Sequence, residues 1–407
     1  MPESRVINLS AGPCSLPEPV LHEAAKGLLN FNGTGIGIAE VSHRSKEFHD
    51  YLVEVEGLIR TQLGVPETHS ILFAQGGGAL QFSAIVLNLL ARHRLLHPDL
   101  PDAERVMDYV VTGWFSEIAV GEAGRLGGGE VNVVVDSRSH SKDGKTFDNI
   151  PPHEAYRGKF SPDPALIFYC DNETIDGVGF SDDTASPTSF PFHLLPKDPK
   201  YTLLPLVGDY SSSFMSRPIP HLADHAIIFA SAQKNIGPAG VTVLIVRKDC
   251  LVDVDAAAKL GAAPVPYTMA YKTLSDNFSL YNTPSVLAIY ITGLVLRRSQ
   301  ELGGVKYYEG VNKRKADKLY SVIKEGEAKG VLQARVKEGS GRSLMNVVFD
   351  FGDRDMQAKF VSGAEARGIK GIKGHPYVCT RLSIYNAVTE EQVDTVVAYM
   401  KDFLASA

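Results

Sequence analysis

One lysine lies in the middle of the stretch Ser231-Ala232-Gln233-Lys234-Asn235-Ile236-Gly237-Pro238-Ala239-Gly240, which separates two apolar runs. These runs, 226–230 and 241–246, have the length and the β-branched content of buried strands. Most lysines are solvated surface charges, but the glycines and the proline shape this turn tightly and few of its residues are polar. A lysine amine that loses its water has a lowered pKa and can form a Schiff base with a carbonyl compound. The sequence therefore predicts that Lys234 is a reactive lysine between two core strands.

The stretch resembles the pyridoxal-phosphate lysine segment of the phosphoserine aminotransferase family, in the class V, fold-type I group of aminotransferases. Other motifs similar to those of the family recur in order along nearly the whole chain, from Ser10-Ala11-Gly12-Pro13 to Arg381-Leu382-Ser383-Ile384-Tyr385-Asn386-Ala387. The first of these resembles the family's N-terminal segment, which closes over the active site. The resemblance implies that pyridoxal 5′-phosphate is bound to Lys234 as a Schiff base.

The resemblance also implies an α/β fold of the fold-type I transferases. We expect a large cofactor-binding domain over 17–285, with a mixed, mostly parallel seven-stranded sheet flanked by helices. Residues 1–16 and 286–407 are expected to form a smaller domain from the N-terminal arm, a long linking helix and a C-terminal α+β part. The alternation of helix and strand patterns after residue 304 is typical of such a compact α+β unit.

Length, charge and cysteine usage narrow the class of protein. The 407 residues, 44% of them hydrophobic, can bury a large core. A net charge of −6 gives no support for nucleic-acid or membrane partners. The four cysteines are scattered without a CxxC pair, which suits a reducing compartment. With no signal-peptide pattern and no apolar run of membrane-spanning length, we expect a cytoplasmic protein.

A glycine-rich loop follows a short buried strand and leads into a predicted helix over 82–92. Its sequence is Gly76-Gly77-Gly78-Ala79-Leu80-Gln81. The free N–H groups and the positive dipole end of a helix suit a phosphate. The loop lacks the third glycine of a dinucleotide fingerprint and the GK[ST] of a P-loop. Together with the downstream lysine, it is the expected cradle for the cofactor phosphate through the amides of Gly78 and Ala79, although many relatives have arginine in place of Ala79.

Two more predicted strands end in turns with candidate cofactor contacts. Strand 109–113 leads to Trp114 and Phe115, and aromatic residues in such a place usually belong to the core. The resemblance implies that an aromatic here stacks on the pyridine ring; Phe115 aligns best, with Trp114 as the alternative. Strand 165–170 leads to a loop at the kind of strand end where α/β sheets bind ligands, or to a plain Asx turn. In the family this loop makes Thr174 a hydrogen-bond donor near the 3-oxygen of the cofactor.

Asp209 ends the apolar run 203–208. A buried carboxylate costs free energy unless it is paired. Capping is its commoner role, but the pyridinium nitrogen of the cofactor is a suitable partner that would make the ring an electron sink. The chain between Asp209 and Lys234 is long enough for one strand–helix–strand unit, which would bring both residues to one sheet edge. The resemblance adds Gln233 to the cofactor-binding set.

For two further motifs, the resemblance implies an active site shared between subunits. Ser42-His43-Arg44-Ser45 precedes a predicted helix over 47–63, and it reads equally as a serine cap or as an anion-binding His/Arg pair. In the family this pair, His43 and Arg44, holds the substrate phosphate, often across the dimer interface. Asn282 and Thr283 precede a long helix over 286–302 and could simply cap it. In the family they reach the cofactor phosphate of the other subunit, which predicts a homodimer.

The last motif resembles the substrate-binding segment of the family. The family reads Gly-His-Arg-Ser-Val-Gly-Gly-x-Arg where this chain has Gly374-His375-Pro376-Tyr377-Val378-Cys379-Thr380-Arg381. The guanidinium fork of Arg381 suits the α-carboxylate of every substrate. His375 is retained for the substrate phosphate, but Pro376 replaces an arginine that helps to bind it in relatives.

The resemblance implies a pyridoxal-phosphate-dependent aminotransferase of serine biosynthesis. It moves an amino group between L-glutamate and 3-phosphohydroxypyruvate, giving O-phospho-L-serine and 2-oxoglutarate. Pro376 keeps open another class V transaminase or lyase that acts on a non-phosphorylated substrate. A cofactor-binding module without catalysis is opposed by Asp209, Lys234 and Arg381, because mere cofactor retention does not need Arg381.

Overall fold

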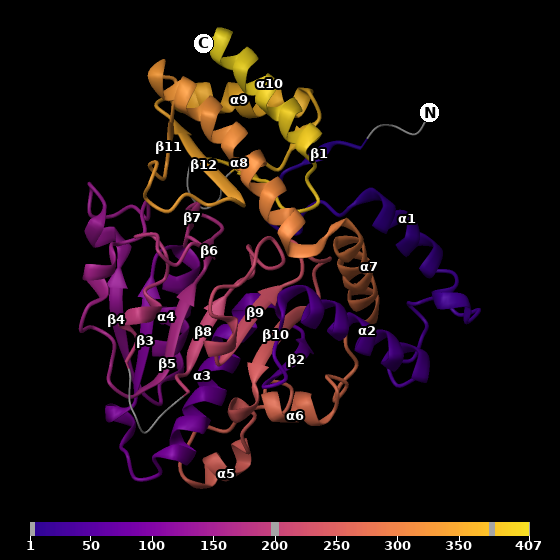
Figure 1. The fold of residues 1–407 in the computed structure, drawn as a ribbon, viewed down its shortest axis with the longest axis vertical. Coiled ribbons are helices and arrows are strands. Elements are labelled where there is room, and N and C mark those ends of the chain that lie inside the picture. Colours follow the sequence, from indigo (N-terminus) through magenta and orange to yellow (C-terminus); the bar gives the residue numbers. More distant parts are fainter. Residues whose placement is uncertain (1–4, 197–202, 374–378, 407) are drawn as a thin grey trace.

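A mixed sheet forms the centre of the molecule (Figure 1). The computed structural model describes residues 5–196, 203–373 and 379–406 of the chain. Among these residues, the central sheet has seven strands, in the order β2 (His69–Ala74), β10 (Thr242–Arg247), β9 (Ile227–Ser231), β8 (Leu206–Asp209), β5 (Pro164–Cys170), β3 (Val106–Val111) and β4 (Glu130–Asp136). Strand β10 is antiparallel to both of its neighbours, and the strands from β9 to β4 are parallel. The prediction of a mixed, mostly parallel sheet is confirmed.

Both faces of this sheet are buried, as is usual for parallel strands flanked by helices. Successive residues of β9 point to opposite faces: Ile228 joins the core that contains residues of α2 (Lys46–Leu63) and α7 (Val286–Leu302). Its neighbour Phe229 joins the second core, with residues of α3 (Gly77–Leu96) and α4 (Trp114–Leu126). The remaining helices of this part are α1 (Glu18–Gly27), α5 (Val254–Lys259) and α6 (Tyr271–Asp276).

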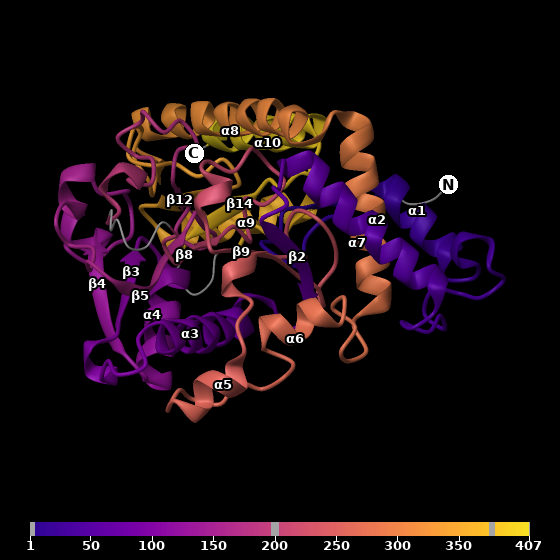
Figure 2. The same cartoon turned by 60° about the horizontal axis from the view of Figure 1, so that its bottom comes forward.

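The C-terminal part packs around a core of its own (Figure 1). Its antiparallel sheet runs in the order β11 (Leu332–Ala334), β12 (Asn346–Phe351) and β14 (Thr380–Ser383). Its helices are α8 (Gly304–Ala328), α9 (Arg354–Ala366) and α10 (Glu390–Ser406), and α8 and α10 lie side by side (Figure 2). This is the α+β arrangement that the sequence predicts for the second part of the fold.

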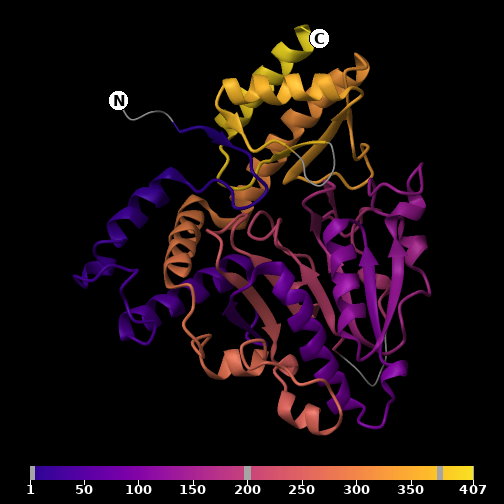
Figure 3. The same ribbon diagram turned by 180° about the vertical axis from the view of Figure 1, so that it is seen from behind.

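The N-terminal arm reaches this C-terminal part (Figure 3). Strand β1 (Ile7–Asn8) pairs in parallel with β13 (Ile369–Lys370), and Leu9 is fully buried in the C-terminal core. A two-stranded ladder of β6 (Asn172–Glu173) and β7 (Val178–Gly179) follows β5. Short 3₁₀ helices are η1 (Phe31–Gly33), η2 (Asp102–Glu104), η3 (Ser137–His140), η4 (His153–Tyr156), η5 (Phe192–Leu194), η6 (Leu222–Asp224) and η7 (Lys248–Cys250).

Two local predictions are wrong. No α-helix links β8 to β9; their connection, which lies wholly within the described residues, contains only η6. Helix α3 begins at Gly77 rather than near residue 82, because the glycines form its cap and first turn, with Gly76 at a φ of 88°. Among the described helices, none has both the length and the apolar character needed to cross a lipid bilayer.

Candidate active site

Lys234 lies in the connection between β9 and β10, as the sequence predicts. Its Nζ donates a hydrogen bond of 2.7 Å to Oγ1 of Thr174 and lies 5.1 Å from the centre of the Phe115 ring. Burial lowers the pKa of Lys234, and the nearby Asp209 carboxylate partly opposes this shift. The lysine therefore has the environment that favours a neutral, nucleophilic amine.

Asp209 is the last residue of β8 and is buried. It pairs in register with Cys170 at the end of β5 and with Phe229 of β9, so three parallel strands bring their carboxyl ends to this edge. Its Oδ1 accepts a hydrogen bond of 2.8 Å from the Ser211 amide. Burial raises the pKa of Asp209, whereas the charge of Lys234 lowers it. The structure thus brings a buried acid into the field of the reactive amine.

The glycine turn of α3 faces the lysine segment. A Cβ on Gly77 would lie 3.6 Å from Oγ of Ser231 and 3.9 Å from Nε2 of Gln233, and one on Gly78 would lie 3.7 Å from the same hydroxyl. The first amides of a helix have no partner within the helix, and here they belong to Gly77, Gly78 and Ala79. Free amides at a helix start are donors that suit a phosphate group, so these residues fit the phosphate of a cofactor.

Arg381 comes to the site from β14 of the C-terminal part. Its side chain is buried, and NH1 donates a long hydrogen bond of 3.4 Å to the carbonyl of Thr174. Its Nε has no hydrogen-bond partner, and burial lowers the pKa of the guanidinium. A buried guanidinium with unused donors is costly by itself and suits a carboxylate ligand.

The N-terminal arm lies against the lysine on another side. A Cβ on Gly12 would lie 3.3 Å from Cγ of Lys234, and Sγ of Cys14 donates a hydrogen bond of 2.7 Å to the Lys234 carbonyl. The hydroxyl of Tyr385 donates to the Ala11 carbonyl at 2.9 Å. Sequence reasoning placed this arm over the site but assigned nothing to Cys14 or Tyr385. No local pattern marks them, since their contacts join residues hundreds of positions apart.

Two other predicted pairs form their hydrogen bonds outside this cluster. His43 and Arg44 contact each other before α2, where Nε of Arg44 donates to Nε2 of His43 at 3.3 Å. Asn282 and Thr283 are exposed, and Gln75 donates to the Thr283 carbonyl at 2.9 Å. Among the described residues, no hydrogen bond or ion pair joins these two pairs to Lys234, Asp209 or Arg381.

Two residues of the substrate motif are not placed. The predicted phosphate ligand His375 and its neighbour Pro376 lie outside the described residues.

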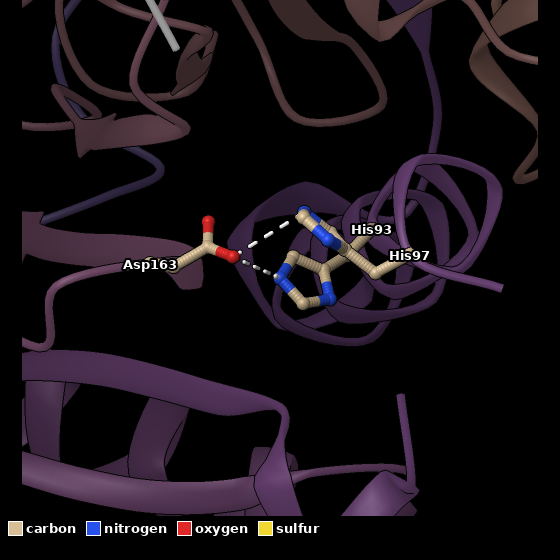
Figure 4. A group of neighbouring side chains, drawn as sticks. All are labelled: His93, His97 and Asp163. Carbon is tan, nitrogen blue, oxygen red and sulfur yellow. Dashed lines mark ion pairs between the residues drawn. The ribbon is translucent and has the colours of Figure 1, made fainter. Parts of the chain in front are cut away.

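A second group of polar side chains stands at the opposite end of β5. His93 and His97 hold Nε2 at 3.8 Å and 3.3 Å from Oδ2 of Asp163, which directly precedes β5 (Figure 4). NH1 of Arg105 donates to Nδ1 of His93 at 2.8 Å. A metal-binding histidine needs a proton on the nitrogen that does not bind the metal, but here that nitrogen accepts. The His93 ring therefore carries its proton on Nε2, toward Asp163, and the arrangement does not suit a metal ion.

This group predicts acid sensitivity. Burial lowers the pKa of His93 to about 4, and the charges of His97 and of the Arg105 guanidinium lower it further. As the pH falls below 6.5, the unfolded chain takes up this proton first, so stability is lost down to about pH 4. We expect wild-type protein to lose about 3 kcal/mol more over this range than His93→Gln. Denaturant unfolding between pH 7.5 and pH 4.5 measures this loss of unfolding free energy, with His22→Gln at an exposed position of α1 as the control. If the unfolding free energies of wild type and His93→Gln fall in parallel with pH, His93 is not the source of the acid sensitivity.

Comparison with known protein families defines the class. Residues 6–396 match the family model described as aminotransferase class-V. The matched range contains Lys234, Asp209, Thr174 and Arg381. The chain belongs to the class-V aminotransferase family.

Full-length relatives narrow this class further. The phosphoserine aminotransferase of Burkholderia cenocepacia (strain HI2424) is 39% identical, over 98% of both chains. Phosphoserine aminotransferase 1, chloroplastic, of Arabidopsis thaliana is 37% identical, over 99% of this chain and 83% of the relative. The crystal structure of pyridoxal-phosphate-bound phosphoserine aminotransferase from Trichomonas vaginalis superposes with a TM-score of 0.81 at 35% identity, covering 98% of this chain and 100% of that chain. Within its class, the chain thus belongs with the phosphoserine aminotransferases, as the sequence resemblance predicts.

Proposed function

We propose that the protein is a pyridoxal-phosphate-dependent aminotransferase that exchanges an amino group between L-glutamate and 3-phosphohydroxypyruvate. The products are O-phospho-L-serine and 2-oxoglutarate, and the reaction serves serine biosynthesis. One observation carries the proposal: a lysine with lowered pKa, a buried acid and a buried arginine with unused donors converge beyond the carboxyl ends of β5 and β8. The kinship with phosphoserine aminotransferases supports the choice of substrates.

The cofactor would be held by residues from several loops of this edge. We assign this role to Gly78, Ala79, Trp114, Phe115, Thr174, Asp209, Gln233, Lys234, Asn282 and Thr283. Pyridoxal phosphate, when bound, supplies an electron sink for the charge that develops on the substrate α-carbon. The α3 amides would bind its phosphate, and Asp209 would hold a proton on its ring nitrogen.

The chain's own groups account for the proton transfers. Lys234 has a lowered pKa and can accept a proton from the α-carbon and return one. Arg381 binds the α-carboxylate that both substrates share, which orients the α-carbon for this transfer. Gly12 and Cys14 of the N-terminal arm cover the lysine backbone and exclude water from that side. Lys234 and Asp209 are thus the catalytic residues of the proposal.

We also propose a homodimer with shared sites. His43, Arg44, Asn282 and Thr283 have no bond to the lysine cluster within one chain, among the described residues, and a partner subunit would bring its own copies of them. The exposed aromatic rings of Phe278 and Tyr281, next to Asn282, support an interface there.

Further parts of the proposal concern organisation and location. The domain division at 17–285 against 1–16 and 286–407 is supported by the separate C-terminal core, which includes Leu9 of the arm. The four cysteines are free, which agrees with a reducing compartment and a cytoplasmic enzyme.

Substrate preference tests the proposed function. The kcat/KM for 3-phosphohydroxypyruvate should exceed that for hydroxypyruvate by about 100-fold or more, because each charge-assisted hydrogen bond to a phosphate contributes about 1.5–3 kcal/mol. Pro376, in place of an arginine in relatives, favours the second candidate, a class V transaminase for non-phosphorylated substrates. A preference for hydroxypyruvate would establish that candidate instead.

Arg44→Ala tests the assigned phosphate site. We expect KM for 3-phosphohydroxypyruvate to rise about 10- to 100-fold, through the loss of one charge-assisted bond. KM for L-glutamate should change little, because glutamate has no phosphate. Lys46→Ala is the matched control, since it removes an exposed positive charge that pairs with Asp50. Equal increases for both substrates would remove the phosphate role of Arg44.

A further inference from the structure

Two buried acids flank Thr174, the residue that accepts the Lys234 hydrogen bond. Glu173 accepts from the amides of Phe115 and Ser116, at 2.9 Å and 3.0 Å. Oδ2 of Asp176 accepts from the amide of Trp114 at 2.8 Å. The three amides are the first three of α4, the turn that carries the Phe115 ring to the lysine. The segment 173–176 therefore contacts both the Lys234 amine and the turn formed by Trp114 and Phe115.

Burying these two carboxyl groups side by side costs free energy. Both are fully buried, and burial together with their mutual repulsion raises the pKa of Glu173 to about 7. Burial likewise raises the pKa of Asp176 to about 6. The positive end of the α4 dipole offsets part of this cost, and Arg335 lies 3.6 Å from Oδ1 of Asp176. An ordinary serine or aspartate cap would satisfy one helix end at lower cost.

The aromatic turn and the segment 173–176 are packed too closely to move independently. A Cβ on Gly113, the residue before α4, would lie 2.3 Å from Cγ of Glu173. Gly113 instead donates its amide to Oγ of Ser116 at 3.1 Å, which closes the turn on its other side. The first three amides of α4 thus donate to two acids that lie on the same short segment as Thr174.

We propose that Glu173 and Asp176 are positioning residues that fix the Trp114–Phe115 turn relative to the Lys234–Thr174 pair. Within the described residues, neither acid has a hydrogen bond or ion pair to Lys234. They act through the turn and through Thr174, and the Glu173 carboxylate is also close enough for its charge to act on Lys234. The effect of these residues on catalysis rests on the proposed function. Their effect on the placement of the aromatic turn does not depend on that function.

Glu173→Gln tests the placement of the aromatic turn separately from its catalytic consequence. The amide keeps the shape but has one oxygen, so one backbone N–H of the turn would face an NH₂ group instead of an acceptor. Asp176→Ala removes the oxygen that accepts from the Trp114 amide. Trp114 is the single tryptophan of the chain, so its fluorescence in cofactor-free protein reports on this turn alone. We expect a shifted emission maximum and easier acrylamide quenching in both variants.

The loaded enzyme provides the second readout. We expect the dissociation constant for pyridoxal phosphate to rise about tenfold, and kcat to fall more than KM changes. Asp108→Asn is the matched control, because Asp108 is a buried carboxylate that accepts hydrogen bonds from Ser161 and Asn132 without touching the turn. It should lower thermal stability but leave Trp114 emission and cofactor affinity unchanged.

Each outcome decides between positioning and mere stability. If Glu173→Gln and Asp176→Ala lower the melting temperature as Asp108→Asn does, with unchanged Trp114 fluorescence and cofactor affinity, the proposal is overturned. If Glu173→Gln does not fold, Asp176→Ala, which removes a single backbone bond, decides by the same readouts. If wild-type protein bound no pyridoxal phosphate, the proposed function would fail, while Trp114 fluorescence would still decide the placement of the turn.

Discussion

Lys234→Ala is expected to lower kcat for transamination at least about 1,000-fold, since a positioned acid–base group contributes about 10²- to 10⁴-fold. The variant loses the amine that donates to Thr174, lies against the Phe115 ring and has its pKa lowered by burial. It should also lose the visible absorbance of a lysine-bound cofactor. Steady-state rates with L-glutamate and 3-phosphohydroxypyruvate, together with absorption spectra, measure both effects.

Lys248→Ala is the matched control for this loss. Lys248 follows β10 and is exposed, so its replacement should leave rate and spectrum unchanged. A Lys234→Ala enzyme with near-normal kcat would refute the lysine assignment.

Arg381→Gln is expected to lower kcat/KM about 100-fold or more for L-glutamate and for 3-phosphohydroxypyruvate alike. Both substrates carry the α-carboxylate, and hydrogen bonds to charged groups contribute about 1.5–3 kcal/mol each. The same change should leave the melting temperature unaltered or raise it, because a buried guanidinium with an unpartnered Nε is removed. Activity and stability would thus move in different directions.

Arg342→Gln separates this effect from the general loss of an arginine. Arg342 donates to the Val336 carbonyl and lies over the Tyr320 ring, so its loss should reduce stability rather than kcat/KM. If Arg381→Gln weakens only one of the two substrates, the assignment to the shared α-carboxylate fails.

Regular elements were largely predictable from sequence. The run before Asp209, the two runs around Lys234 and the helix over 286–302 follow from apolar periodicity alone. The missing helix between β8 and β9 was not predictable in this way. There Ser212 bonds to the Asn172 carbonyl, Ser213 to Asp171 and Ser216 to the Ser213 carbonyl, and such side-chain bonds compete with helix formation.

The site was predictable in its parts but not in its assembly. Lys234 and Thr174 are 60 positions apart, and Arg381 and Thr174 are 207 apart, so no local pattern shows that they meet. The link between Glu173 and the α4 amides is equally remote in sequence. For Asn282 and Thr283, no hydrogen bond among the described residues reaches the lysine cluster, so their predicted role stays a prediction.

Borohydride reduction of the purified holoenzyme, followed by mass spectrometry of its peptides, identifies the lysine that carries the cofactor. We expect a phosphopyridoxyl group on Lys234. The strongest rival is Lys315 of α8, whose pKa is lowered to about 7 by burial, although three backbone carbonyls accept from its Nζ. A label on Lys315, or on any lysine other than Lys234, would contradict the account.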